Sequence, residues 1–275
     1  MMKKLVVLLL LMSHVGVMAQ RKPKIKGNRS VTEVKEELPA FNGIELKDDL
    51  DIELIKAPLE GFKVVGDDNL MDILKFKVED STLYISSFYK IRSKKKLEIT
   101  IYYNDLVRIV QEDGKLISKE SIATDILDIE VVGDSRMELN ASAGLVRLQM
   151  MDKTSGDFNL AADSLNVVMK DRSDARIYAV GQSSYIELQS NASAGFEGTV
   201  DTLQVETRDN TDLKAERYEA KVIKAKLENS TSAHLRAFED LELITNGSSK
   251  AYIYANPKIT ILEFLDTSEL IKRKD

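Results

Sequence analysis

Polar turn residues that recur at a near-constant interval are the residues of this sequence with the clearest chemical potential. Nine Asp or Asn residues follow one another at spacings of 21, 18, 19, 20, 19, 19, 17 and 20. They are Asp113, Asp134, Asp152, Asp171, Asn191, Asn210, Asn229, Asn246 and Asp266. Asp and Asn bond nearby backbone groups and tolerate left-handed turn conformations, so a structural role is expected for the series. If the series forms a column in space, its four leading carboxylates lie one repeat apart and repel one another.

These four carboxylates, Asp113, Asp134, Asp152 and Asp171, are the candidate site. A basic residue follows each of them within two positions, which favours local neutralisation. The basic residues are Lys115, Arg136, Lys153 and Arg172. The alternative is a bound Ca²⁺ ion, which takes six to eight oxygen ligands from acidic sites of this kind.

The same residues raise the question of catalysis. Solenoid enzymes that cleave acidic polysaccharides use Asp clusters with a basic residue, and five residues here imitate that set: Asp134, Asp152, Asp171, Arg136 and Arg172. His234 is the only histidine beyond the export signal, so a His-based triad has one candidate base. We expect His234 to be an exposed residue of the repeat, and we assign no catalytic or cofactor-binding residue.

Short alternating apolar runs flank each Asx turn, and these runs predict the elements that position it. The run Leu165-Asn166-Val167-Val168 precedes one turn and a run centred on Ile177 follows it, and both kinds of run recur about every 19 residues. Two short strands per repeat fit one coil of a parallel β-solenoid, in which each strand pairs with its equivalent one coil further on. Leucine-rich repeats fit less well, because their Leu-x-x-Leu-x-Leu motif is missing. A β-sandwich fits less well, because its regularly spaced hairpin signals are missing. We therefore predict an all-β parallel β-helix.

The chain divides into four parts. Residues 1–19 have the charged start, apolar run and small-residue cleavage site of a signal peptide. Residues 20–40 form a polar leader, and residues 41–258 form the β-helix, with irregular N-terminal coils over 41–105 and regular coils over 106–258. Residues 259–275 are a last coil or a C-terminal cap. No further apolar segment follows the signal peptide, so no integral membrane segment is expected after cleavage.

Composition excludes several classes of function. The sequence has no cysteine, which rules out disulfides, thiolate catalysis and a lipid-modified cysteine. It has 39 basic and 45 acidic residues, and removal of the signal peptide with Lys3 and Lys4 leaves a net charge of −8. Without a basic excess to neutralise phosphates, nucleic acid is not an expected partner.

The order of motifs resembles a known bacterial family. Phe41-Asn42-Gly43-Ile44 is followed by Leu50-Asp51-Ile52-Glu53-Leu54, by the polar-turn repeats and by Ala251-Tyr252-Ile253-Tyr254-Ala255-Asn256-Pro257. This arrangement, over about Phe41 to Pro257, resembles the exported family named putative auto-transporter adhesin, head GIN domain. The resemblance implies a right-handed parallel β-helix with no established catalysis. This chain has fewer glycines in its turns than the family pattern.

The expected function is that of an exported, non-enzymatic interaction module of a Gram-negative bacterium. It is expected in the periplasm, on the outer-membrane surface or secreted, with a glycan, a surface protein or further copies of itself as partners. A carbohydrate-active β-helix enzyme acting on acidic polysaccharide is the alternative.

Overall fold

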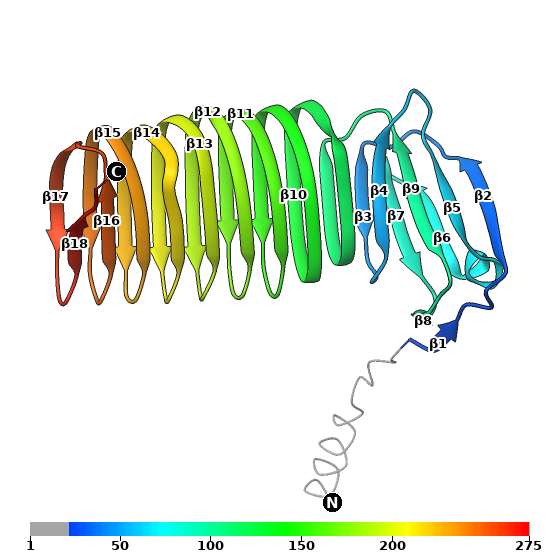
Figure 1. Cartoon of the computed structure of the whole chain (residues 1–275). Helices are drawn as coiled ribbons and strands as arrows, with labels where there is room; N and C mark the ends of the chain where they lie inside the picture. The colour runs from blue at the N-terminus through cyan, green and yellow to red at the C-terminus, as the bar shows by residue number, and fades with distance from the viewer. Residues whose placement is uncertain (1–21, 275) are drawn as a thin grey trace, which may run out of the picture.

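The protein is a long parallel β-solenoid with a mixed β-sheet region at its N-terminal end (Figure 1). The computed structural model describes residues 22–274, so the predicted signal peptide lies outside the described residues. Strands make up 74% of the described residues and helix 2%, and the solenoid has about 7 turns of about 19 residues each. The predicted all-β parallel solenoid and its repeat length are therefore confirmed.

The solenoid strands pair in parallel with the equivalent strands of the next coil. Their bounds are β10 (Arg108–Met150), β11 (Ser155–Met169), β12 (Asp174–Gln189), β13 (Ser193–Arg208), β14 (Asp212–Glu228), β15 (Ser232–Thr245), β16 (Lys250–Tyr254), β17 (Lys258–Phe264) and β18 (Glu269–Lys272). Phe158 of β11 pairs with Ile177 of β12, which pairs with Phe196 of β13, at a constant offset of one coil. Equivalent residues of successive coils therefore stack in straight rows along the solenoid.

Each coil buries alternate residues of two runs and leaves the residues between them outside. In β11 the first run buries Phe158 and Leu160, and the second buries Leu165, Val167 and Met169. The buried residues of successive coils join into one continuous apolar core, and the polar residues of the alternating pattern face water.

The N-terminal strands combine parallel and antiparallel pairing. Their bounds are β1 (Lys24–Lys26), β2 (Val31–Glu37), β3 (Gly43–Leu46), β4 (Asp51–Lys56), β5 (Gly61–Asp67), β6 (Leu74–Glu79), β7 (Thr82–Ser87), β8 (Lys90–Ser93) and β9 (Leu97–Tyr103). Strands β3 and β4 pair in parallel with β10 and so begin the stack. Strands β2, β5 and β9 form an antiparallel arrangement on one side, and β6 and β7 form a hairpin on the other.

A short 3₁₀ helix, η1 (Asp68–Ile73), connects β5 to β6, with Asp67 as its N-cap residue. Asn69 lies inside η1. Its side chain accepts a hydrogen bond from the backbone amide of Asn28 at 2.9 Å and donates one to the carbonyl of Lys26 at 2.9 Å. The Asn69 side chain thus links the segment around Lys26 and Asn28 to η1.

The buried carboxylate of Asp67 makes a second connection to the same segment. It accepts hydrogen bonds from the backbone amides of Arg29 at 3.2 Å, Lys95 at 3.0 Å and Lys96 at 3.3 Å. The amide of Lys95 is the main cause that holds the pKa of Asp67 below its usual value. Three amides on one carboxylate favour its charged form.

The C-terminal strands continue the parallel stack. β17 pairs with β15, and β18 pairs with β16. All seven residues of β17 are exposed, including Ile259, Ile261 and Phe264. The division of the chain into leader, irregular coils, regular coils and last coil or cap remains a prediction. Within residues 22–274, no helix has the length and apolar character needed to cross a membrane.

The coil of β14 contains an extra residue. The register between β13 and β14 shifts after Gly195, so that Gly195 pairs with Lys214 but Glu197 pairs with Arg217. Tyr218 follows this bulge and is fully buried, with its ring centroid 5.5 Å from that of Phe196. Its hydroxyl lies 2.7 Å from the hydroxyl of Ser184. The bulge therefore places a phenol in the core of the solenoid.

Candidate functional site

The Asx turns join the second run of one coil to the first run of the next, where the backbone has a positive φ. The turn positions with positive φ are Gly114, Gly133, Asp152, Asp171, Ser190, Asn191, Asp209, Asn210, Asn229, Gly247 and Asp266. Six members of the predicted series have positive φ themselves: Asp152, Asp171, Asn191, Asn210, Asn229 and Asp266. The other three, Asp113, Asp134 and Asn246, lie directly beside a glycine with positive φ. The predicted column is therefore staggered.

The stagger gives the four leading carboxylates separate structural partners. Asp113 accepts a hydrogen bond from the backbone amide of Asp134 at 3.1 Å. Asp152 accepts one from the amide of Gly133 at 3.1 Å, and Asp171 accepts one from the amide of Asp152 at 3.4 Å. These bonds connect turns of adjacent coils and use donors that the turn leaves unpaired.

The basic neighbours contact other partners than the sequence suggests. Lys153 does pair with an Asp of the series, Asp134, at 3.0 Å. Lys115 instead pairs with Glu138 at 3.0 Å, and Arg136 pairs with both Glu138 and Asp157 at 3.1 Å. These two cations therefore neutralise the face of the solenoid rather than the turn.

The calcium hypothesis for Asp113, Asp134, Asp152 and Asp171 gains no support from this geometry. Within residues 22–274, no three or more His, Cys, Asp or Glu side chains come close enough together to hold a metal ion. The site remains an untested prediction.

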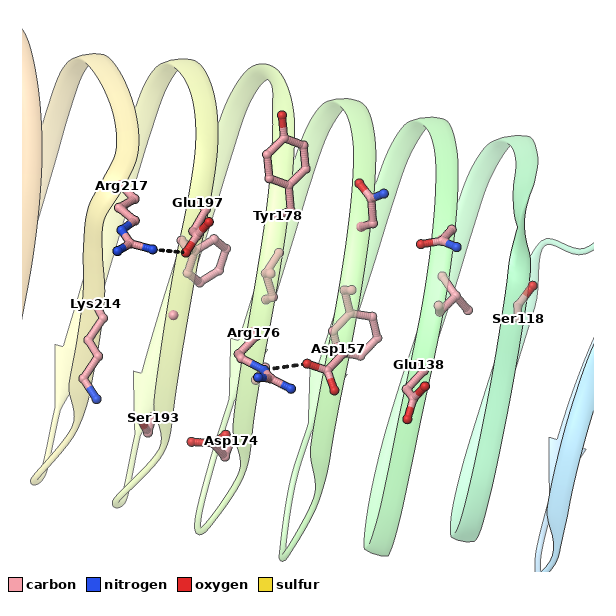
Figure 2. A pocket seen from close by; sticks show the side chains of 18 of the residues that line it. Ser118, Glu138, Asp157, Asp174, Arg176, Tyr178, Ser193, Glu197, Lys214 and Arg217 are labelled. Atoms are coloured by element: carbon pink, nitrogen blue, oxygen red, sulfur yellow. Dashed lines mark hydrogen bonds and ion pairs between the residues drawn. The ribbon is translucent and has the colours of Figure 1, made fainter.

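An open groove lies on the outer face of the first runs of the coils (Figure 2). It has a volume of about 870 Å³ and extends across strands β10 to β14. Its lining includes Glu138, Asp157, Arg176, Tyr178, Glu197 and Arg217. These side chains come from successive coils and project outward from the strands, so the rigid parallel ladder fixes their spacing at about 4.8 Å per coil.

Ion pairs run along the groove between neighbouring coils. Asp157 accepts hydrogen bonds from Arg176 at 2.6 Å and from Arg136 at 3.1 Å, and Arg217 pairs with Glu197 at 3.0 Å (Figure 2). The hydrogen bond that Arg176 donates to Asp157 raises the pKa of Arg176. On the neighbouring coil, the hydrogen bond from Lys115 is the main cause that lowers the pKa of Glu138. These charges are exposed, so each pair contributes little stability.

A row of residues in lateral register runs along the middle of the groove and continues beyond it. This central row consists of Glu138, Asp157, Arg176, Gly195, Lys214, His234 and Tyr252. At Gly195 the row has a gap, because an added Cβ atom would meet no atom within 4 Å. The groove therefore has a notch between two cationic residues.

His234 occupies the central row but is only partly exposed. Its ring stacks on that of Tyr252 with centroids 4.4 Å apart, and its Nδ1 lies 3.0 Å from the hydroxyl of Tyr254. It is a residue of the repeat, as the sequence predicts, but it is half-buried rather than exposed, and its neighbours in the row are Lys214 and Tyr252.

Reasoning from the sequence missed the groove residues Arg176, Tyr178 and Glu197. Each is an outward-facing residue of a strand, and alternation alone predicts only that such positions are polar. The offset of one coil places Asp157, Arg176 and Gly195 in one row, so aligning the first runs coil by coil is the signal that identifies them.

The fold and the groove together define a parallel β-solenoid with an open groove, lined by charged residues, on one face. The chain belongs to the family described as putative auto-transporter adhesin, head GIN domain, whose model matches residues 40–257. The resemblance noted in the sequence is thereby confirmed. No curated protein matches the chain.

Solved structures share the fold over nearly the whole chain. A putative adhesin from Parabacteroides distasonis has a TM-score of 0.68 at 16% identity and covers 91% of this chain and 100% of its own. A putative adhesin from Parabacteroides merdae has a TM-score of 0.64 at 15% identity, covering 91% and 99%. A putative lipid binding protein from Parabacteroides distasonis has a TM-score of 0.62 at 20% identity, also covering 91% and 99%.

Proposed function

We propose that this protein is an exported, non-enzymatic interaction module of the bacterial envelope or surface, and that its groove binds a glycan or a surface protein. The observation that carries the proposal is the groove of about 870 Å³ on the face of β10 to β14. Its floor consists of strands fixed by a continuous parallel ladder, so a ligand meets an array of side chains that is already ordered. Preorganisation of this kind lowers the entropic cost of binding.

The electrostatics of the groove support binding rather than catalysis. A general acid that cleaves a glycosidic bond needs a carboxyl group with a raised pKa. Glu138 has a lowered pKa because Lys115 and Arg136 donate hydrogen bonds to it. Asp157 is held between Arg136 and Arg176. Glu138 thus favours the charged form, which does not suit a general acid.

The polar lining supports a hydrophilic ligand. One solved relative is named a putative lipid binding protein, whereas others are named putative adhesins. Apart from Ile117 and Gly195, the outward groove residues of this chain are charged or carry hydroxyl or amide groups, and Tyr178 is the exposed aromatic among them, at 51% exposure. Hydroxyl-rich glycans match such a surface better than an acyl chain does.

Export is supported by the signal peptide that residues 1–19 predict and by membership of an adhesin-like family. The chain that begins at Gln20 is the form to test.

Glycan-array binding, together with binding to immobilised fibronectin, laminin and mucin, tests the proposal. Gly195→Tyr should abolish binding, because its side chain fills the notch and its Cβ meets no obstacle. Gln204→Tyr is the matched control, since Gln204 is an exposed residue of the second run of the same strand, β13. Absence of binding to every glycan and protein, or equal binding by the two variants, would refute the proposal. Release of products from polygalacturonate, with or without Ca²⁺, would refute the non-enzymatic assignment.

A further inference from the structure

The central row changes its chemical character along the solenoid. Its first two members, Glu138 and Asp157, are acidic. Beyond them come Arg176, the notch at Gly195 and then Lys214. The side chains of Arg176 and Lys214 are 78% and 59% exposed, and each also pairs with one carboxylate, Arg176 with Asp157 and Lys214 with Asp212. A ligand in this part of the row therefore meets cations on both sides of a gap, each about one strand spacing of 4.8 Å from it.

A stack of three planar groups continues the row beyond Lys214. His234 of β15 stacks on Tyr252 of β16 at 4.4 Å, and the guanidinium of Arg273 lies 4.8 Å from the centroid of the Tyr252 ring. Stacking fixes the plane of a guanidinium while leaving the N–H groups at its edge available to an acceptor.

Arg273 differs in its partners from the arginines of the groove. Arg136, Arg176 and Arg217 each pair with a carboxylate. Within residues 22–274, the salt bridges include none to Arg273, and its side chain is exposed. An exposed, oriented guanidinium without an acidic partner in the described chain is suited to bidentate binding of an external carboxylate or sulfate.

We propose that the part of the central row from Arg176 to Tyr252, together with Arg273, binds an acidic polysaccharide. This inference rests on the proposed function of the groove as a binding face. The polysaccharide lies along the solenoid axis, with a ring or ring substituent in the notch at Gly195. Its carboxylate or sulfate groups contact Arg176, Lys214 and Arg273. The acidic start of the row, at Glu138 and Asp157, repels the same groups and fixes the end of the site.

Titration calorimetry with four probes tests the ligand class. The probes are polygalacturonate (carboxylate), dextran sulfate (sulfate), dextran (uncharged) and vesicles of phosphatidylcholine with phosphatidylglycerol (an anionic lipid surface). Binding of polygalacturonate or dextran sulfate, weakened by added salt, is the expected result. Preference between the two identifies the anionic group. Equal binding of dextran, or binding of the vesicles alone, would overturn the inference.

Charge-removing variants test the residues. Lys214→Gln and Arg273→Gln should each weaken binding of the acidic probe about tenfold, because each removes a charge-assisted hydrogen bond. Lys224→Gln is the matched control: Lys224 belongs to the second run of the same strand as Lys214 and is 61% exposed. All three variants should keep the melting temperature of the parent. If Lys214→Gln and Arg273→Gln bind the acidic probe as tightly as Lys224→Gln does, the proposed site for an acidic polysaccharide is refuted. If Gly195→Tyr still abolishes binding of a neutral glycan or a protein in that case, the proposed function of the groove stands without the acidic-polysaccharide site.

Discussion

The buried pair of Tyr218 and Ser184 offers a quantitative test of how the core accommodates the extra residue of β14. Ser184 faces inward at a position where the neighbouring coils carry Leu165 and Leu203. The small side chain of Ser184 leaves room for the Tyr218 hydroxyl, which lies 2.7 Å from the Ser184 hydroxyl. Burial raises the pKa of Tyr218, so the phenol stays protonated at neutral pH.

Removing either hydroxyl leaves the other buried. Tyr218→Phe keeps the ring against Phe196 but leaves the hydroxyl of Ser184 without its partner, and Ser184→Ala does the reverse. A buried polar group without a partner costs about 1–3 kcal/mol, so each single variant should be destabilised by about that amount. The double variant removes both groups and should lie within about 1 kcal/mol of the parent.

Urea denaturation of the parent, both single variants and the double variant measures this cycle, with the dependence on urea checked to be equal in all four. The coupling should be at least about 1 kcal/mol. Strictly additive effects, or a Tyr218→Phe variant as stable as the parent, would refute the view that the two hydroxyls satisfy each other.

Three further predictions concern the turns, a glycine and the N-terminal region. Gly198 has a φ of +115°, and an added Cβ would collide with the carbonyl oxygen of Ala179. Gly198→Ala should therefore lower the free energy of unfolding, followed by thermal melting, by roughly 1–3 kcal/mol. Gly195→Ala should be near neutral, because its added Cβ meets no atom. Because the pKa of Asp67 is lower in the folded state, its carboxylate stabilises the protein above the unfolded value of about 3.9. This stabilisation disappears as pH falls through the pKa of Asp67 in the folded state. Asp67→Asn should therefore lower the melting temperature at pH 7 but lower it much less at pH 2. An equal loss of melting temperature at the two pH values would contradict the role of the charge. Millimolar Ca²⁺ should leave the melting temperature unchanged, because turn amides bind the carboxylates of Asp152 and Asp171; a Ca²⁺-dependent rise that Asp152→Asn removes would establish the metal site instead.

The repeat could be predicted from the sequence because one physical rule sets it. Parallel strands of equal coils place apolar residues at a constant offset, so Phe158, Ile177 and Phe196 recur once per coil. The turn series was less regular, with spacings from 17 to 21, because a turn tolerates Gly, Ser, Asp or Asn at the position with positive φ. Gly133 and Gly247 occupy that position beside Asp134 and Asn246. The first residue with positive φ in each turn, from Gly114 to Asp266, recurs more evenly than the predicted series does.

The N-terminal pairing and the groove could not be predicted in the same way. Alternation predicts strands at β5 and β9, but it does not distinguish their antiparallel pairing from the parallel pairing of β4 with β9. Which strand pairs with which edge of β9 depends on the paths of the loops that connect the strands. For the groove, the partner of Arg136 depends on lateral register: Asp157, on the next coil, pairs with it in place of the sequence neighbour Asp134.

Each coil of the solenoid contacts mainly the coil before it and the coil after it, and the central row gains one side chain per coil. An additional coil would therefore lengthen the row by about 4.8 Å and leave the other side chains in place. A substitution in one coil would change the charge at a single step. In such a molecule, the length of ligand that is recognised and the pattern of charge on that ligand can vary independently, through duplication of coils in the one case and through point substitution in the other.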